Sequence, residues 1–132
     1  MKGTIRIFTA VTLGANGRPG CALLHVQDSH RRVLSEVVQP INAPPSSGIR
    51  GARFAALVAA LDAGRKFRAS SVEVHTEDPS LVDAVYKKAG VNPELVGLYL
   101  QARANMHRYK EAKISYAPYP AMSDFPLIAA GC

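Results

Sequence analysis

The sequence predicts a single α/β domain with a five-stranded mixed sheet and helices packed against it. Three strand-like segments follow one another at the start of the chain, before any helical pattern appears. After them, segments with helical spacing alternate with two further strand-like segments. This order is typical of a mixed sheet, in which an antiparallel meander is extended by helix-linked strands. The length of 132 residues fits one domain, 1–132, and leaves little room for a second.

The first part of the chain is predicted to form a three-stranded antiparallel meander. Strands are expected at residues 4–9, 21–27 and 32–40. A loop rich in turn formers, Gly14–Gly20, separates the first two, and a short polar link, Asp28–Arg31, joins the next two. Strands of this length that are joined by so short a link pair antiparallel. Alternation along the third strand places Val33, Ser35 and Val37 on one face.

The first helix is predicted from about Arg50 to the neighbourhood of Gly64, after a loop that contains Pro44-Pro45. Its apolar residues recur with the spacing i, i+3, i+4, i+7, which places them on one helix face: Phe54, Leu57, Val58 and Leu61. The alanines between them favour helix and allow close packing. This helix therefore supplies the main cover for the sheet.

The rest of the chain alternates between strand and helix. A fourth strand is expected over 71–76, and Asp78-Pro79 has the form of a helix start, with Asp78 as N-cap. That helix closes before Gly90, and the next one runs from Asn92 to about Tyr109. A fifth strand follows at 113–117, and 118–132 form a tail or a short terminal helix.

Four motifs along this order are similar to those of a known family. Residues 8–12 read Phe-Thr-Ala-Val-Thr and precede Asn16-Gly17, where the family has Thr-Asp-Gly-Ser before a loop rich in Asn, Gly and Pro. Residues 53–61 form an alanine-rich helix segment, and residues 76–78 read Thr-Glu-Asp where the family has Thr-Asp-Ser. Residues 114–118 and 123–127 follow the last strand and the start of the last helix. The chain resembles a ribonuclease HI-type domain over nearly its whole length.

The resemblance implies a specific chemistry. Members of the family hydrolyse phosphodiesters with four carboxylates that hold two divalent cations about 4 Å apart. Hard cations such as Mg²⁺ need oxygen ligands, so the number of acidic residues decides whether the site can work.

This sequence departs from the family at two of the four acidic positions. Ala10 stands at the position of the first-strand Asp, and Arg53 stands at the position of the helix Glu. Glu77 corresponds to the third acid, although a shift of one residue would place Asp78 there, and Asp124 corresponds to the fourth. We therefore expect Glu77 and Asp124 to be remnants of a degenerate catalytic site that holds no metal. No cofactor is expected, and Mg²⁺ or Mn²⁺ would bind only if the domain is still an enzyme.

Arg53 suggests a replacement for the lost cations. Its guanidinium could pair with Glu77, with Asp124 or with both, and so stabilise the acidic site without a metal. The plainer interpretation is that Arg53 faces solvent, that Glu77 and Asp78 form an ordinary strand end and helix cap, and that Asp124 is an exposed or capping acid.

The charge of the chain is compatible with a polyanionic partner. Sixteen Lys and Arg against ten Asp and Glu give a net charge of +6 and a pI near 9.6. The residues that we expect to contact nucleic acid are Arg50, Arg53, Lys87 and Lys88. For Lys87 and Lys88 the alternative role is to complement a helix C-terminus.

Three functions follow from these observations. The first is a module that binds RNA, DNA or their hybrid and has lost hydrolysis. The second is an active or residually active ribonuclease H, completed by other acids such as Asp78, Glu73 or Asp28. The third is a protein-interaction or oligomerisation domain, a homo-oligomer included, whose apolar stretch at 125–130 packs across an interface.

Other classes of function find little support in the sequence. The four histidines lack zinc-ligand spacing, and the loop at 14–20 lacks the lysine of a phosphate-binding loop. No apolar run approaches the length that spans a bilayer, and the first residues lack a signal-peptide core. We therefore expect no membrane partner and a cytoplasmic location.

Overall fold

The computed structural model describes residues 3–13, 20–86 and 90–117. Its strands are β1 (Thr4–Thr12), β2 (Cys21–Gln27), β3 (Val33–Pro40), β4 (Ser71–Thr76) and β5 (Glu111–Tyr116). Its α-helices are α1 (Gly48–Arg65), α2 (Pro79–Val85) and α3 (Val96–Met106), with 3₁₀ turns η2 (Pro45–Ser47) and η3 (Pro93–Leu95) before α1 and α3. The predicted order of elements is confirmed.

The five strands form one mixed sheet in the order β3-β2-β1-β4-β5. β1, β2 and β3 pair antiparallel, as the short Asp28–Arg31 link predicts, whereas β1, β4 and β5 pair parallel. The parallel pairs need crossover connections, which α1 supplies between β3 and β4 and which α2 and α3 supply between β4 and β5. The carboxyl ends of β1, β4 and β5 therefore meet at the same edge of the sheet.

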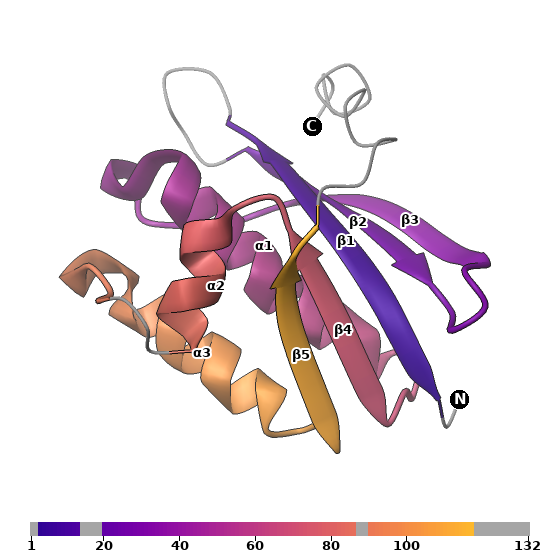
Figure 1. The fold of residues 1–132 in the computed structure, drawn as a ribbon. Helices are drawn as coiled ribbons and strands as arrows, with labels where there is room; N and C mark the ends of the chain where they lie inside the picture. Colours follow the sequence, from indigo (N-terminus) through magenta and orange to yellow (C-terminus); the bar gives the residue numbers. More distant parts are fainter. Residues whose placement is uncertain (1–2, 14–19, 87–89, 118–132) are drawn as a thin grey trace.

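All three helices lie on one face of the sheet (Figure 1). The core fills the space between them, and its largest members are fully buried. They come from the strands as well as from α1, and include Ile5, Ile7, Leu24, Val26, Phe54, Leu57, Leu61, Val72 and Val74. Three of the four residues that the helical spacing selected in α1 are buried, and the fourth, Val58, is partly buried against the same core. None of the described helices is long and apolar enough to cross a membrane.

The structure corrects several predicted boundaries. β1 runs three residues further than predicted, and β5 begins at Glu111 rather than at residue 113. The predicted helix from Asn92 to Tyr109 is a 3₁₀ turn followed by the shorter α3. β1 continues beyond the point where its alternation of apolar and polar residues ends, because hydrogen bonds to β2 extend it. The residues of β1 alone do not predict this extension.

A register shift changes the predicted face of Val33. Val26 pairs with Ser35 but Gln27 pairs with Val33, so one residue of β3 is extra at this point. Because directly paired residues point to the same face, Val33 lies on the opposite face from Ser35. The prediction that Val33, Ser35 and Val37 share a face is therefore wrong for Val33.

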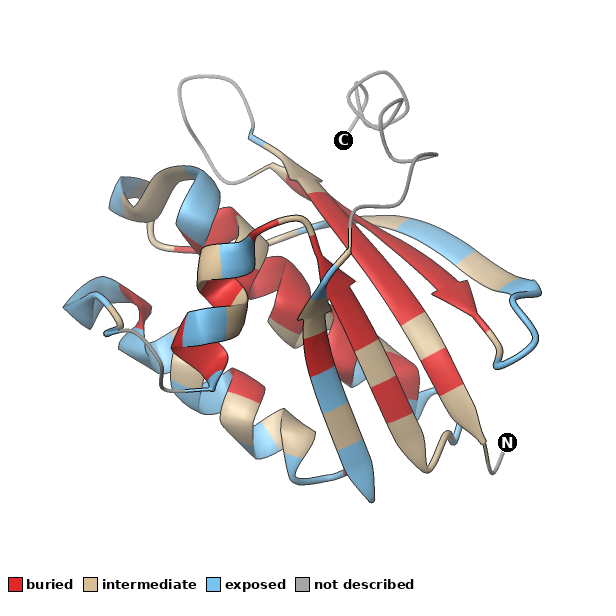
Figure 2. Cartoon of the chain, in the orientation of Figure 1, coloured by how far each residue is buried: buried red, intermediate tan, exposed pale blue. Residues whose placement is uncertain are grey.

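The face of the sheet away from the helices carries a second apolar cluster, which we call the second-face cluster: Phe8, Ala10, Cys21 and Leu23. All seven residues of β2 are buried, so this strand is covered on both faces. Figure 2 shows the contrast with the edge strand β3, which is exposed along much of its length.

A row of interacting side chains crosses the same face next to this cluster. His25 contacts Glu36 through Nδ1 at 2.7 Å, and its ring meets the Phe8 ring edge-on at 6.1 Å. Phe8 stacks on His75 at 4.6 Å, and Nδ1 of His75 lies 3.1 Å from the Ser115 hydroxyl. Each contact joins residues paired on adjacent strands, so the row links all five strands of the sheet.

Candidate functional site

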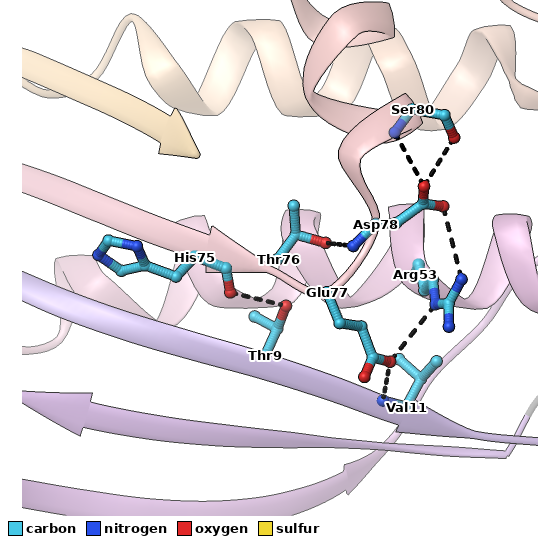
Figure 3. A network of polar contacts seen from close by, with 8 residues as sticks. All are labelled: Thr9, Val11, Arg53, His75, Thr76, Glu77, Asp78 and Ser80. Carbon is cyan, nitrogen blue, oxygen red and sulfur yellow. Dashed lines mark hydrogen bonds and ion pairs between the residues drawn. The ribbon is translucent and has the colours of Figure 1, made fainter. Parts of the chain in front are cut away.

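Three of the residues singled out from the sequence, Arg53, Glu77 and Asp78, come together where β1 and β4 end and α2 begins. Ala10 lies near the end of β1, and Glu77 directly follows β4. Asp78 precedes the first residue of α2, and Arg53 reaches the same point from α1. The close-up in Figure 3 shows the side chains of Arg53, Glu77 and Asp78 directed toward one another.

Arg53 forms ion pairs with both carboxylates. Its Nε donates to Oε1 of Glu77 at 3.4 Å, and its Nη1 lies 3.7 Å from Oδ2 of Asp78 (Figure 3). The Arg53 and Glu77 side chains are each 30% exposed, whereas that of Asp78 is 10% exposed. The predicted pairing of Arg53 with Glu77 is therefore present, and Arg53 also pairs with Asp78.

A backbone group fixes the Glu77 carboxylate beside β1. The N–H of Val11 donates to Oε1 of Glu77 at 3.3 Å, so the same oxygen receives both Val11 and Arg53. Val11 follows Ala10 in the chain, which brings the position of the missing first-strand acid next to Glu77. The Val11 contact could not be predicted from the sequence, because a backbone donor carries no residue-type signal.

Asp78 has a second role as the N-cap of α2. Its Oδ1 accepts from the Ser80 N–H at 3.0 Å and from the Ser80 hydroxyl at 2.6 Å. The N–H of Asp78 donates in turn to the Thr76 hydroxyl at 3.2 Å. These bonds satisfy donors at the helix start and hold one carboxylate oxygen away from Arg53. The predicted cap is confirmed, and Pro79 occupies the first helical position as expected.

His75 lies two residues before Glu77, in the row that crosses the second face. Burial lowers the pKa of its imidazole below the usual value, and the positive charges of Arg6 and Lys113 lower it further, against the opposing effect of Glu73. Among the buried side-chain nitrogens and oxygens that the structure describes, His75 Nε2 has no hydrogen-bond partner. A second ring proton would find no acceptor there, which agrees with the direction of the pKa change.

The charges at this site do not fit a pair of divalent cations. Arg53 places a permanent positive charge against the two acids, and Ala10 offers no ligand. In the ranges 3–13, 20–86 and 90–117, no cluster of three or more His, Cys, Asp or Glu side chains is arranged to hold a metal ion. The described residues therefore do not fit the two-metal centre that the resemblance implies.

Of the remaining predicted residues, the structure describes Arg50. Arg50 is exposed on α1, one turn before Arg53, and lines a small crevice of about 10 Å³ together with Ser80. Lys87, Lys88 and Asp124 lie outside the described residues. Asp124 as the fourth acid, and Lys87 and Lys88 as nucleic-acid contacts, therefore stay predictions.

The other acids named for an active enzyme lie elsewhere. Asp28 accepts the N–H groups of His30 and Arg32 in the β2–β3 hairpin, at the opposite end of the sheet from Glu77. Glu73 forms an ion pair with Arg6 at 3.9 Å on the second face. The structure thus corrects the suggestion that either acid joins Glu77, and among the acids named for an active enzyme it places Asp78 beside Glu77.

Comparison with solved structures identifies the fold. A ribonuclease H1 from the halophilic archaeon Halobacterium salinarum NRC-1 aligns over 92% of this chain and 90% of its own, with a TM-score of 0.81 and 17% identity. The N-terminal ribonuclease H domain of rv2228c from Mycobacterium tuberculosis aligns over 91% of both chains, with a TM-score of 0.76 and 22% identity. The chain has the ribonuclease H-like fold.

Further comparisons show how far this sequence differs from those of known ribonuclease H-like proteins. LC11-RNase H1, solved in complex with an RNA/DNA hybrid, aligns over 89% of this chain and 87% of its own, with a TM-score of 0.70 and 22% identity. No family model matches the sequence, and no curated protein matches it. The chain therefore shares the fold of these proteins, but its sequence identity to them is too low to show which activity it has.

Proposed function

We propose that this domain binds nucleic acid and no longer performs two-metal hydrolysis. The observation that carries the proposal is the ion pairing of Arg53 with both Glu77 and Asp78. A guanidinium in this place neutralises acids that would otherwise attract divalent cations, and it replaces an acid that the family uses as a ligand. The loss of hydrolysis follows from that exchange of charge.

The proposed partner is RNA, DNA or their hybrid. The net charge of +6 favours a polyanion, and a structural neighbour was solved with an RNA/DNA hybrid. Arg50 is exposed beside the site and is a candidate to contact a phosphate, and Lys87 and Lys88 are further candidates. Arg53 is engaged by two carboxylates, so we assign it a smaller share of phosphate binding than Arg50.

Binding and hydrolysis are measured on the same substrates. Fluorescence anisotropy with short labelled duplexes of RNA, DNA and hybrid should show binding that weakens on the order of 100-fold between about 50 and 200 mM salt, if about four phosphates are contacted. The same substrates, incubated with Mg²⁺ or Mn²⁺ at high protein concentration, should remain intact. Absence of binding at low salt contradicts the first part of the proposal, and cleavage that Glu77→Gln abolishes contradicts the second.

A matched pair of variants tests where the nucleic acid lies. Arg50→Gln removes a charge beside the site, and Arg32→Gln removes the same charge from the distant β2–β3 hairpin. Both side chains are exposed, so neither change should disturb the fold. We expect Arg50→Gln to weaken binding about three- to tenfold and to reduce the salt dependence by about one phosphate. Equal effects of the two variants would show that binding is spread over the surface rather than centred at the site.

A further inference from the structure

The end of the sheet opposite the candidate site carries a concentration of positive charge. The segment 65–70 joins α1 to β4, and the segment 103–110 contains the end of α3 and its connection to β5. We call these two segments together the basic end. They contain no Asp or Glu and six Lys and Arg residues: Arg65, Lys66, Arg68, Arg103, Arg108 and Lys110. The length of β4 separates the basic end from Glu77 by about 20 Å.

Backbone contacts hold the two segments of the basic end side by side. The N–H of Lys110 donates to the Ser70 carbonyl at 2.8 Å, and Ser71 and Glu111 then pair as the first residues of β4 and β5. The Tyr109 hydroxyl donates to a backbone carbonyl of α1. Figure 1 shows both connections at the end of the sheet where β4 and β5 begin. The six cations therefore belong to one region of the surface, although the two segments are far apart in the chain.

The cations of the basic end are not neutralised by ion pairs. Among the residues that the structure describes, none of the six forms an ion pair with an acid. The acids that flank the two segments, Asp62 and Glu111, are exposed. Five of the six cations are exposed as well, and the sixth, Arg103, is half-buried and donates to the Val85 carbonyl at 3.4 Å. The basic end therefore presents uncompensated positive charge to solvent.

The ends of the helices account for part of this charge. Cations in the last turn of a helix complement its negative pole, and the effect falls off within that turn. Arg65 and Arg103 meet this condition in α1 and α3. Arg68 and Lys110 lie beyond the helices, which end at Arg65 and Met106. Their charges therefore contribute little to the stability of either helix.

The backbone at Arg68 favours glycine rather than arginine. Its φ is 54°, in the left-handed region, where a Cβ is disfavoured and glycine fits without strain. The turn between α1 and β4 therefore does not require an arginine at this position. The exposed guanidinium remains available to a partner.

A hollow of about 240 Å³ lies within the basic end. Its lining consists of Arg103, Met106, His107, Tyr109, Lys110 and Ala112. Two of the six cations, Arg103 and Lys110, thus face the same hollow. A water molecule occupies about 30 Å³ of liquid, so the hollow has room for a phosphate group and its water.

A phosphate backbone matches the basic end better than a membrane surface does. Peripheral binding to a membrane combines cations with apolar side chains that enter the lipid. The large apolar side chains of the two segments, Phe67, Met106 and Tyr109, are packed in or against the core. Both segments are described in full, and neither has an exposed large hydrophobic side chain. A phosphate backbone needs cations and hydrogen-bond donors alone.

We infer that the basic end is a second nucleic-acid contact surface, which binds the phosphate backbone without reading bases. The inference rests on the proposed function and adds to it a contact at the opposite end of the sheet from Arg50. Arg68 and Lys110 each contribute a phosphate contact, one from each segment. Phosphates are common to RNA and DNA, so this surface does not distinguish between them.

A double variant with one change in each segment tests this surface. Arg68→Gly/Lys110→Gln removes two exposed charges from the basic end. Fluorescence anisotropy at about 100 mM salt should show about tenfold weaker binding, and the slope of log affinity against log salt should fall by about two. The loss should be the same for RNA, DNA and hybrid duplexes. The Tm should be unchanged or higher, because glycine adopts the φ of residue 68 without strain.

The matched control is Arg31→Gly/Arg32→Gln in the β2–β3 hairpin, which β1 separates from β4 and β5. It also removes two exposed charges, and Arg31 also has a left-handed φ, 65°. We expect this variant to weaken binding by about threefold or less. Equal losses in the two double variants would overturn the inference, because binding would then follow the net charge alone.

Three further results would also overturn the inference. The first is unchanged duplex binding in Arg68→Gly/Lys110→Gln, and if Arg50→Gln still weakens binding, the proposed function holds without a second surface. The second is binding of the wild-type protein to phosphatidylserine vesicles that this double variant abolishes while duplex binding is unchanged, which would assign the basic end to a membrane. The third is a wild-type protein that binds no duplex at low salt, which contradicts the proposed function as well.

Discussion

Arg53, Glu77 and Asp78 together carry one positive and two negative charges, with nitrogen–oxygen separations of 3.4 Å and 3.7 Å. The Arg53 and Glu77 side chains are partly exposed, so solvent screens the pair and its contribution to stability is small, on the order of 1 kcal/mol or less. Its importance lies in what the charge excludes. At the scale of single residues, these three side chains therefore decide which ions the site can bind and contribute little to the stability of the fold.

Restoring the two missing acids should restore metal binding. In the double variant Ala10→Asp/Arg53→Glu, carboxylates stand again at the two positions where the family has acids, and no guanidinium opposes the cation. We expect calorimetric titration with Mn²⁺ to detect millimolar or tighter binding that the wild-type protein lacks.

The control for this variant is Ala10→Asn/Arg53→Gln, which has similar volumes without the negative charges. It should bind Mn²⁺ no better than the wild-type protein. If the wild-type protein binds Mn²⁺ as tightly as the double variant, Arg53 does not exclude cations.

His75 should make stability depend on pH in the acidic range. Its pKa is lowered in the folded state from the ordinary value of 6.5, so the unfolded chain binds the proton first. Stability is therefore unaffected by this group above its unfolded pKa and is lost as pH falls from about 6.5 toward the lower folded value. Urea unfolding at pH 7.5 and 5.5 should show a smaller pH-dependent loss in His75→Gln than in the wild-type protein. The same loss in both would assign the pH dependence to other groups.

At this scale the sequence identified the main participants but not their arrangement. The resemblance singled out Ala10, Arg53 and Glu77, and the structure brings Arg53 and Glu77 together. The Val11 N–H and the row through Phe8 and His75 were missed, because they depend on strand pairing between residues far apart in the chain.

At the scale of elements, Tyr109 joins the end of α1 to the segment between α3 and β5. Its hydroxyl donates to the Leu61 carbonyl, and burial raises its pKa to about 12. Gly64 makes room for this contact, since a Cβ there would lie 2.5 Å from the Tyr109 hydroxyl oxygen. The glycine that the sequence placed near the helix end therefore serves packing between elements.

Removing the Tyr109 hydroxyl should loosen this junction. Tyr109→Phe loses one buried hydrogen bond, and we expect the free energy of unfolding to fall by about 1–2 kcal/mol at pH 7. Because the folded pKa is raised above 10.0, the wild-type protein should lose stability as pH rises above 10, and the variant should lose less. Tyr116→Phe, in a residue that is 53% exposed, is the control and should be neutral in urea unfolding.

The start of α2 depends on the side chain of Asp78. Asp78→Ala removes the acceptor for the N–H and the hydroxyl of Ser80, and we expect a loss of about 1 kcal/mol in urea unfolding. Asp78→Asn keeps an acceptor and removes the charge that faces Arg53, so its loss should be smaller. Equal losses in the two variants would assign the role of Asp78 to its charge rather than to the cap.

Element types were predictable where local signals were strong, and boundaries were not. Periodicity located α1, and the Asp78-Pro79 pair located α2. The 3₁₀ turn at Pro93–Leu95 and the extra residue in β3 depend on contacts with the rest of the molecule. Such contacts override local preference.

At the scale of the whole molecule, the mixed character of the sheet followed from the connections between its strands. A four-residue link predicted the antiparallel hairpin, and the helical connections predicted a mixed sheet, in which the structure pairs β4 and β5 parallel. The burial of β2 on both faces was not predicted, although its first four residues, Cys21–Leu24, are all apolar, a pattern typical of a strand that is covered on both faces.

The order of the strands also has a consequence for synthesis on the ribosome. β1 emerges first but lies at the centre of the sheet, and its parallel partner β4 follows only after α1. The meander of β1, β2 and β3 can pair early, while the other edge of β1 keeps its unpaired backbone groups until Thr76 has left the exit tunnel. During that interval the nascent chain presents an open strand edge, the kind of surface that chaperones protect from pairing with a neighbouring chain.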